Sequence, residues 1–189
     1  AAVKNLKKAG ITPRYLHAAN SIGLLRFKKA HLNLVRAGIL LYGLNPSSSS
    51  ALPKGMRPLL SFKTCISFLK KTGKNRSISY GATYRTAKPT LIATLPVGYS
   101  HGYRLGLSNR GTVLVGGKRC PVVGRVTMDQ TLVDVGGVPG VQRWQEVILI
   151  GRDRSQSVRA EDLAGLLGTI PYEIVCAIHP RVPRIYSGS

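Results

Sequence analysis

Ser21, Gly38 and Ile39 are the residues of this sequence whose types and positions suit a phosphate ligand. Proteins bind phosphate through hydroxyls and backbone N–H groups in loops that follow β-strands. We predict a strand over residues 14–19, which Ser21 would follow, and Gly38 offers an N–H with no Cβ in the way. The alternatives are a turn or N-cap role for Ser21 and a strand irregularity at Gly38. The residues alone favour these alternative roles.

Arg36 is a charged residue within an apolar stretch, residues 32–42, that we predict to be a second strand. An unpaired charge inside such a strand is costly, so we expect a polar group to face Arg36. His17 lies in the first predicted strand, where the sequence is equally compatible with a core histidine and with a functional one.

Residues 3–9 carry apolar side chains at helical spacing and are followed by Gly10, which predicts a helix that ends there. Helix, strand, polar loop and strand is the order of a β/α unit. The first segment therefore resembles the tail of a larger α/β domain, too short to close a barrel alone. Residues 45–50 (Asn-Pro-Ser-Ser-Ser-Ser) predict a linker, and we place the domain boundary there, between 1–50 and 51–189.

Short β-segments dominate the rest of the sequence. They are separated by turn residues such as Gly116-Gly117 and are predicted at residues 59–71, 77–86, 90–97, 112–115, 119–123, 131–135 and 146–150. One late helix is predicted, with Leu163, Leu166 and Leu167 on its apolar face and Gly168 at its end. The expected fold class is mainly β, a β-rich domain preceded by the last β/α elements of a barrel.

The sequence is strongly basic. Its 28 Lys and Arg against 7 Asp and Glu give a net charge of +21, which would suit a nucleic acid or an acidic surface. The basic residues are spread out, without an aromatic stacking cluster among them, so nucleic-acid binding is the lesser alternative. No apolar run approaches the roughly 20 residues of a membrane span, and we expect no membrane association.

Cys65, Cys120 and Cys176 are odd in number and far apart. Disulfide scaffolds and zinc sites use paired spacings, so neither kind of site is expected. We expect all three to be small buried side chains in a protein of a reducing compartment. The chain opens with Ala1 instead of methionine and shows no signal peptide, so we expect a processed or partial chain.

Seven short strings, in order along nearly the whole chain, resemble the alanine racemase family. They are His17-Ala18-Ala19-Asn20-Ser21, Val35-Arg36-Ala37-Gly38-Ile39 with Tyr42-Gly43, Ser79-Tyr80-Gly81-Ala82-Thr83-Tyr84, Gly98-Tyr99, Gly124-Arg125-Val126-Thr127-Met128-Asp129-Gln130, Gly168-Thr169-Ile170-Pro171-Tyr172-Glu173 and Arg181-Val182-Pro183-Arg184. In that family a TIM barrel that binds pyridoxal phosphate precedes a β-rich C-terminal domain, and two subunits pair head to tail. The resemblance implies the C-terminal portion of such an enzyme, with the break between domains near residues 46–58. It also implies alanine as substrate, a cytoplasmic homodimer, and D-alanine supplied for the cell wall.

By this resemblance the cofactor site draws on both segments. The phosphate of pyridoxal 5′-phosphate would be held by Ser21, Gly38, Ile39 and Tyr172. Arg36 would face the pyridine nitrogen of the cofactor, with His17 hydrogen-bonded to Arg36. Because an arginine does not give up its proton, the pyridine nitrogen would stay unprotonated, and side reactions such as transamination would be suppressed.

Racemisation needs a base on each face of the substrate α-carbon. In the family one base is the lysine that binds the cofactor, and the other is the tyrosine that this chain carries as Tyr80, which enters the partner subunit's site. The resemblance also implies that the Met128 N–H contacts the substrate carboxylate and that Tyr99 lines the entrance beside Tyr172. Without the resemblance, Tyr80 would be interpreted as an aromatic residue of a strand.

Two departures from the family pattern bear on activity. No lysine here matches the family's lysine-bearing strand, since Val3-Lys4-Asn5 runs straight into a helix. We therefore expect the barrel segment with that lysine to be missing and the chain as given to be inactive. Ser100-His101 replaces the family's usual Ala-Asp pair, which removes a carboxylate from the entrance and adds a histidine, and Arg104 lies one place earlier than the resemblance predicts.

Two other functions stay open on the sequence. One is a racemase that acts on serine or another small amino acid. The other is a non-catalytic, racemase-like domain that serves as a basic binding or structural module, for example on RNA.

Overall fold

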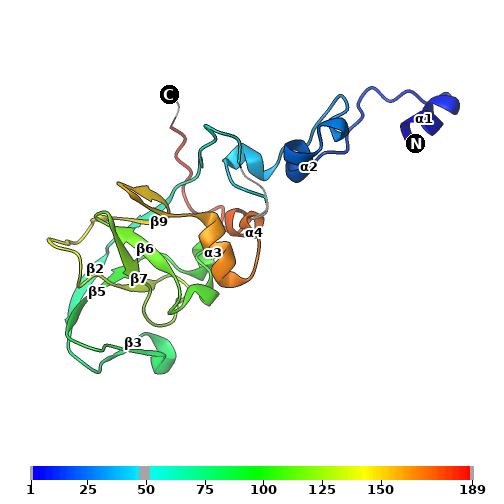
Figure 1. Cartoon of the computed structure of the whole chain (residues 1–189). Coiled ribbons are helices and arrows are strands. Elements are labelled where there is room, and N and C mark those ends of the chain that lie inside the picture. Colours follow the sequence, from blue (N-terminus) through cyan, green and yellow to red (C-terminus); the bar gives the residue numbers. More distant parts are fainter. Residues whose placement is uncertain (1, 47–51, 188–189) are drawn as a thin grey trace. The chain divides into compact units, whose positions relative to one another are not determined.

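The computed structural model describes residues 2–46 and 52–187. The chain forms two compact units, which we call unit 1 (residues 1–57) and unit 2 (residues 58–189) (Figure 1). The predicted boundary between residues 50 and 51, and most of the predicted linker, lie outside the described residues.

Unit 1 is built from short helices. They are α1 (Ala2–Lys8), α2 (Ser21–Arg26) and the 3-10 helices η1 (Lys28–Ala30) and η2 (Ile39–Tyr42). The predicted end of the first helix is confirmed, because Gly10 has a left-handed φ of +76° and the Ile11 N–H donates to the Leu6 carbonyl over 2.9 Å. Asn20 caps α2, since its side-chain oxygen accepts from the Gly23 N–H over 3.0 Å.

The two strands predicted in unit 1 do not form within the described residues. Backbone hydrogen bonds join the two segments at separated points, from the Asn33 N–H to the Leu16 carbonyl (3.4 Å) and from the Arg36 N–H to the Ala19 carbonyl (2.9 Å). The Asn33 side chain replaces part of the strand pairing, accepting from the Leu16 N–H (2.6 Å) and donating to the Arg14 carbonyl (2.9 Å). A β-ladder needs a continuous row of backbone pairs, so the prediction of two strands is wrong.

Unit 2 contains two antiparallel sheets and a short ribbon (Figure 1). The larger sheet has the order β1 (Phe62–Cys65), β9 (Glu146–Asp153), β6 (Thr112–Val115) and β7 (Lys118–Pro121), with β10 (Gln156–Val158) also paired to β9. The smaller sheet has the order β2 (Phe68–Thr72), β5 (Thr90–Leu95) and β8 (Thr131–Asp134). The ribbon pairs β3 (Ser77–Ile78) with β4 (Tyr84–Arg85). The prediction of a β-rich domain is confirmed.

Two of the predicted β-segments each contain two strands. Residues 59–71 divide at Ile66 and Ser67, where the chain passes from one sheet to the other, since Ile66 donates to the Gln145 carbonyl and Ser67 to the Thr94 carbonyl. Residues 77–86 divide around the 3-10 helix η3 (Tyr80–Ala82), so Tyr80 is not an aromatic residue of a strand. The prediction also omitted β10.

Apolar strand residues form the core of unit 2. Val113, Leu114 and Val115 of β6 are 0% exposed, as are Val147 and Leu149 of β9. Burial of successive residues, instead of every second one, means that both faces of these strands are covered. This explains why the sequence shows short continuous apolar runs there.

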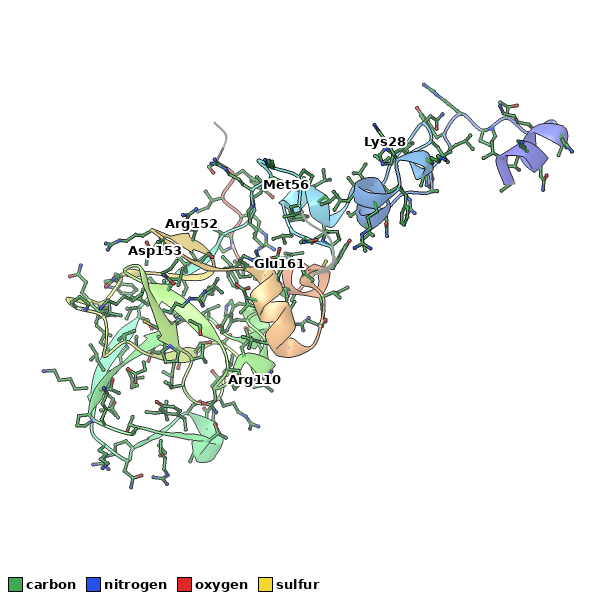
Figure 2. The ribbon with its side chains drawn as sticks, in the orientation of Figure 1. Lys28, Met56, Arg110, Arg152, Asp153 and Glu161 are labelled. Atoms are coloured by element: carbon green, nitrogen blue, oxygen red, sulfur yellow. The ribbon has the colours of Figure 1, made fainter. Side chains whose placement is uncertain are left out.

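A two-glycine turn joins β6 to β7. Gly116 and Gly117 have φ values of +57° and +79°, the left-handed pair that two-residue hairpin turns require. The Gly117 N–H donates to a carboxylate oxygen of Asp153, at the end of β9, over 2.5 Å (Figure 2). The turn predicted at this position is thus confirmed and is fixed by a third strand.

Two helices, instead of the one predicted, follow the sheets. α3 (Ala160–Leu167) ends at Gly168, whose φ is +68°, as predicted. The helix that the sequence analysis did not predict is α4 (Pro171–Cys176), although the sequence contains signals for its start. Pro171 occupies the first turn, where proline is favoured, and Glu173 places a negative charge near the helix N-terminus.

The three cysteines are free thiols in different environments. Cys120 is buried, Cys65 is half-buried and Cys176 is exposed. The prediction of burial is therefore confirmed for Cys120 and wrong for Cys176, which is the last residue of a six-residue helix and lies on its exposed side.

Charge is unevenly distributed along the chain, because no aspartate or glutamate precedes Asp129. Ion pairs in the described structure accordingly use carboxylates from the last third of the sequence, such as Lys63 with Glu146 (3.1 Å) and Arg104 with Glu173 (3.2 Å). Within the described residues, no helix is long and apolar enough to cross a membrane.

Candidate active site

A cavity of about 650 Å³ in unit 2 brings three of the predicted site residues together. Tyr80, Tyr99 and Met128 come from separate segments of the chain, and all three line it. These residues are exposed by 73%, 44% and 55%, so each is open to solvent or to a ligand. The remaining lining residues are Leu105, Arg125, Val126, Thr127, Asp129 and Gln130.

An unusual backbone turn presents Tyr80. Ser79, Gly81 and Ala82 have positive φ values of +64°, +73° and +46°. For the serine and the alanine this is an uncommon conformation, which is kept only where surrounding contacts hold it. The turn places the phenol at the tip of the ribbon between β3 and β4.

The loop that carries Met128 is bound directly to the loop that carries Tyr99. The Tyr99 N–H donates to the Thr127 carbonyl and the Ser100 N–H to the Met128 carbonyl, each over 3.0 Å. A Cβ at Gly98 would lie 2.1 Å from the Thr127 carbonyl oxygen, so only glycine permits this approach. Among the described residues the Met128 N–H has no acceptor, which leaves this donor available to a ligand.

Ser100 and His101, the two departures from the family pattern, lie beside this loop. The Ser100 hydroxyl donates to the carboxylate of Asp129 over 2.7 Å, and His101 Nδ1 lies 3.2 Å from the same hydroxyl. His101 Nδ1 also accepts the Gly98 N–H over 3.3 Å. His101 thus supports the backbone behind the cavity and does not line it. The neighbouring Arg104 forms its ion pair with Glu173 of α4.

Tyr172 is the predicted residue of unit 2 that does not line the cavity. It lies in the first turn of α4 and is half-buried. Its predicted contact with the cofactor phosphate stays a prediction.

The three predicted phosphate ligands of unit 1 lie together. Ser21 is the first residue of α2 and is 1% exposed, and its hydroxyl oxygen accepts the Gly38 N–H over 3.0 Å. Ile39, which follows, begins η2 and is 2% exposed. Asn20, and not Ser21, provides the N-cap, and Gly38 interrupts no strand, so neither alternative role is found.

Arg36 and His17 lie in different surroundings from those expected. Both side chains are exposed, so Arg36 is not a buried charge and His17 is not a core histidine. The expectation of burial rested on two strands that do not form. Among the described residues neither side chain has a hydrogen-bond partner, and the predicted bond between them is not found there.

Two other ionisable side chains have displaced pKa values, and neither lines the cavity. Burial raises the pKa of Cys120 to about 11, and the nearby carboxylate of Asp134 adds to the effect. Complete burial also raises the pKa of Tyr103 above its ordinary value, and its hydroxyl has no partner in the described structure. Both groups are therefore neutral at physiological pH.

Comparison with known proteins identifies the family. The family model described as "Alanine racemase, C-terminal domain" matches residues 59–186, and the model of the N-terminal domain matches residues 1–46. The chain belongs to the alanine racemase family. The two family models leave residues 47–58 unmatched, so the boundary between the two racemase domains lies in this segment.

Racemases of several bacteria are similar over nearly the whole chain. The alanine racemase of Symbiobacterium thermophilum is 50% identical over 188 residues, which are 100% of this chain and 50% of that protein. Alanine racemase 2 of Caldanaerobacter subterraneus subsp. tengcongensis is 46% identical, over 97% of this chain and 47% of that protein. The chain spans about half the length of these relatives.

Solved racemase structures have the same fold. The alanine racemase of Bacillus anthracis with bound L-Ala-P superposes with a TM-score of 0.92 at 41% identity, covering 99% of this chain and 48% of that one. The alanine racemase of Streptomyces lavendulae, described as a D-cycloserine producer, gives a TM-score of 0.93 at 36% identity, with 99% and 49% covered.

Arg125 and Asp129 are cavity residues to which the sequence analysis gave no role. Both belong to the racemase string that also contains Met128, so the signal was present in the motif itself. The motif alone could not show that residues 125–130 line the same cavity as Tyr80.

Proposed function

We propose that the protein to which this chain belongs is an alanine racemase, which interconverts L- and D-alanine with pyridoxal 5′-phosphate as cofactor. The observation that carries the proposal is the cavity of unit 2, in which Tyr80, Tyr99 and Met128 meet. The names of the relatives support alanine as the substrate. No feature of the described residues favours serine, and none of the relatives reported above is named for nucleic-acid binding.

The Ser21–Gly38 pair suits a phosphate. Because the Ser21 oxygen accepts the Gly38 N–H, the serine hydroxyl proton is free to be donated to an anion. We propose that this hydroxyl, the backbone of Gly38 and Ile39 and the Tyr172 hydroxyl hold the cofactor phosphate. Arg36, with five N–H donors and no acceptor, would donate to the pyridine nitrogen, and His17 would orient Arg36.

Tyr80 and Met128 would act on the substrate itself. When bound, pyridoxal phosphate makes the α-proton of an amino acid acidic enough to be removed. We propose that the Tyr80 oxygen removes or returns this proton on one face of the α-carbon, while the cofactor-binding lysine serves the other face. The Met128 N–H would hold the substrate carboxylate in the same cavity.

We further propose a head-to-tail homodimer in which Tyr80 serves the partner's active site. The high exposure of Tyr80 supports this, since a second subunit can reach it. From the similarity to bacterial alanine racemases we also propose that the enzyme is cytoplasmic and supplies D-alanine for the cell wall.

The decisive experiment is complementation between two inactive variants of the full-length enzyme. Tyr80→Phe is mixed with a variant that lacks the catalytic lysine, and the subunits are allowed to exchange. A heterodimer then contains one site with both bases, so racemisation should recover toward a quarter of the wild-type activity, given random exchange and independent sites. A mixture that stays inactive, although native mass spectrometry shows heterodimers, would mean that Tyr80 does not act across the interface.

A further inference from the structure

The Tyr80 turn needs an external support. Ser79 and Ala82 flank Tyr80 and Gly81 with φ values of +64° and +46°, and residues of these types rarely adopt such angles unaided. Tyr80 itself is 73% exposed, so burial of its ring does not fix the turn. Contacts on either side of the tyrosine must therefore do so.

On the N-terminal side the turn rests on the loop at residues 124–126. The Ser79 hydroxyl donates to the Arg125 carbonyl over 2.7 Å. Gly124, with φ of +77°, approaches so closely that a Cβ there would lie 2.5 Å from the Ile78 carbonyl oxygen. This side is thus held by backbone packing and one hydroxyl.

On the C-terminal side the turn runs into β4, where Tyr84 pairs with Ile78, and before that strand Thr83 is bonded by one amide side chain, that of Asn109. Its nitrogen donates to the Thr83 hydroxyl over 3.1 Å and approaches the Thr83 carbonyl at 3.5 Å. Its oxygen accepts the Gly124 N–H over 2.6 Å. A single side chain therefore joins the end of the Tyr80 turn to the same loop that holds its beginning.

The position of Asn109 is itself fixed. It lies in a turn with φ of +58°, next to Arg110 (Figure 2), and asparagine tolerates this left-handed conformation well. The preceding hydroxyl, of Ser108, accepts the Val126 N–H over 2.9 Å. Asn109 and Ser108 thus attach this turn to Gly124 and Val126. Val126 precedes Met128 by two residues.

We infer that Asn109 is a positioning residue for the reaction: it fixes the Tyr80 turn against the loop of Met128 and so sets where the phenol lies relative to the substrate carboxylate. The inference rests on the proposed role of Tyr80 as a base. Misplacement of a reacting group by about 1 Å can lower a rate by about 100-fold. Loss of the amide should therefore act on kcat far more than on KM.

The test compares Asn109→Gly with Asn75→Gly in the full-length enzyme. Glycine removes the amide but accepts positive φ, so no backbone strain is introduced. Asn75 is a matched control, because it lies in the β2–β3 turn with the same φ of +58°. Its hydrogen bonds use its own backbone: its N–H donates to the Thr86 carbonyl, and its carbonyl accepts from the Arg85 side chain. Tyr80→Phe is measured alongside.

Two readouts are expected to change in Asn109→Gly and to stay at the wild-type level in Asn75→Gly. Amide hydrogen exchange of residues 79–84 in the cofactor-free protein should be roughly 30-fold faster, since two hydrogen bonds of about 1 kcal/mol each are lost. In the loaded enzyme kcat should fall about 10- to 100-fold with KM nearly unchanged. A uniform drop in melting temperature for both variants would not produce this pattern.

The outcomes separate the inference from the function beneath it. If Tyr80→Phe retains full activity, the proposed role of Tyr80 is wrong and the positioning role fails with it. If Tyr80→Phe is crippled but Asn109→Gly keeps wild-type kcat and wild-type exchange, the inference alone is overturned. Should Asn109→Gly not fold, Thr83→Val removes the hydroxyl acceptor from the other end, with Thr83→Ser as its control, and the same two readouts decide.

Discussion

The cavity of unit 2 and the Ser21–Gly38 pair of unit 1 are held in different ways. In the cavity, backbone groups of separate loops bond directly to one another, as Tyr99 does to Thr127 at 3.0 Å. In unit 1 the two segments around the pair are joined by the Ser21 hydroxyl oxygen, which accepts the Gly38 N–H, and by separate backbone bonds such as that from Arg36 to Ala19. The cavity of unit 2 is therefore part of a β-framework whose loops bond backbone to backbone, whereas the Gly38 N–H of unit 1 depends on one side-chain oxygen. Substitutions in the two regions should consequently fail in different ways.

The largest effect is expected for Tyr80→Phe in the full-length enzyme. Removal of a proton-transfer group typically costs about 10²- to 10⁴-fold in rate, while the ring and its packing remain. Because L- and D-alanine have equal free energies, kcat/KM must fall equally in both directions. Exchange of the α-proton with deuterated water should instead become one-sided, persisting for the enantiomer that the lysine deprotonates.

NMR of each alanine enantiomer in deuterated water measures this exchange. Equal loss of exchange for both enantiomers, with melting temperature unchanged, would show that Tyr80 is not one of two separate bases.

The next largest effect is a loss in the free energy of unfolding, expected for Gly98→Ala. The new Cβ would lie 2.1 Å from the Thr127 carbonyl oxygen, a backbone atom that cannot rotate away. Overpacking of this kind costs about 1–3 kcal/mol or more, and it should also separate the Tyr99 and Met128 loops. Gly137→Ala is the control, because no atom lies within 4 Å of its Cβ. Equal melting temperatures for the two variants would mean that the β-framework is more compliant than described.

A smaller effect, confined to cofactor affinity, is expected for Ser21→Ala. A hydrogen bond to a charged group contributes about 1.5–3 kcal/mol, so the Kd for pyridoxal phosphate should rise roughly 10- to 150-fold. Ser67→Ala removes a hydroxyl that donates to the Thr94 carbonyl in unit 2 and should leave the Kd unchanged. Titration followed by cofactor absorbance gives both constants, and identical values for the two variants would remove Ser21 from the phosphate site.

The smallest effect concerns the thiols of unit 2. Burial raises the pKa of Cys120 to about 11, so its thiolate is scarce at pH 8 and increases about tenfold per pH unit toward pH 11. Since the folded pKa lies above the ordinary 9.0, the stability that the protonated thiol contributes is complete below pH 9 and is lost as the pH rises through about 11. Exposed Cys176 should react with iodoacetamide first. Mass spectrometry of digests reports both rates, and equal rates at pH 8 would indicate a loosely packed sheet.

Local signals in the sequence predicted those elements that local chemistry determines. Gly10 and Gly168 end their helices, and Gly116-Gly117 turns its hairpin, because each needs a backbone angle that glycine adopts freely. The absence of the two strands predicted in unit 1 could not be foreseen from the sequence, since apolar residues form a strand only where a neighbouring backbone completes the ladder. There, the Asn33 side chain takes part of that role.

The candidate site was predictable as a set of residues but not as an arrangement. The racemase resemblance supplied Tyr80, Tyr99 and Met128, and the structure adds that they share one cavity. The residue types do not predict positive φ at Ser79 or Ala82, because contacts with residues remote in sequence impose it. Asn109 was missed for the same reason: its function lies in what it joins.

The absence of aspartate and glutamate before Asp129 has a consequence for how unit 1 responds to its surroundings. Its lysines and arginines have no carboxylate side chain within the unit to neutralise them, so counter-ions must come from outside it. Mutual repulsion among such charges is screened over about 10 Å at 0.1 M salt. Unit 1 should therefore gain stability as salt is added, whereas the ion pairs of unit 2, such as Lys63 with Glu146, weaken. Salt should thus stabilise unit 1 by screening repulsion alone, whereas in unit 2 the same screening is offset by the weakening of its ion pairs.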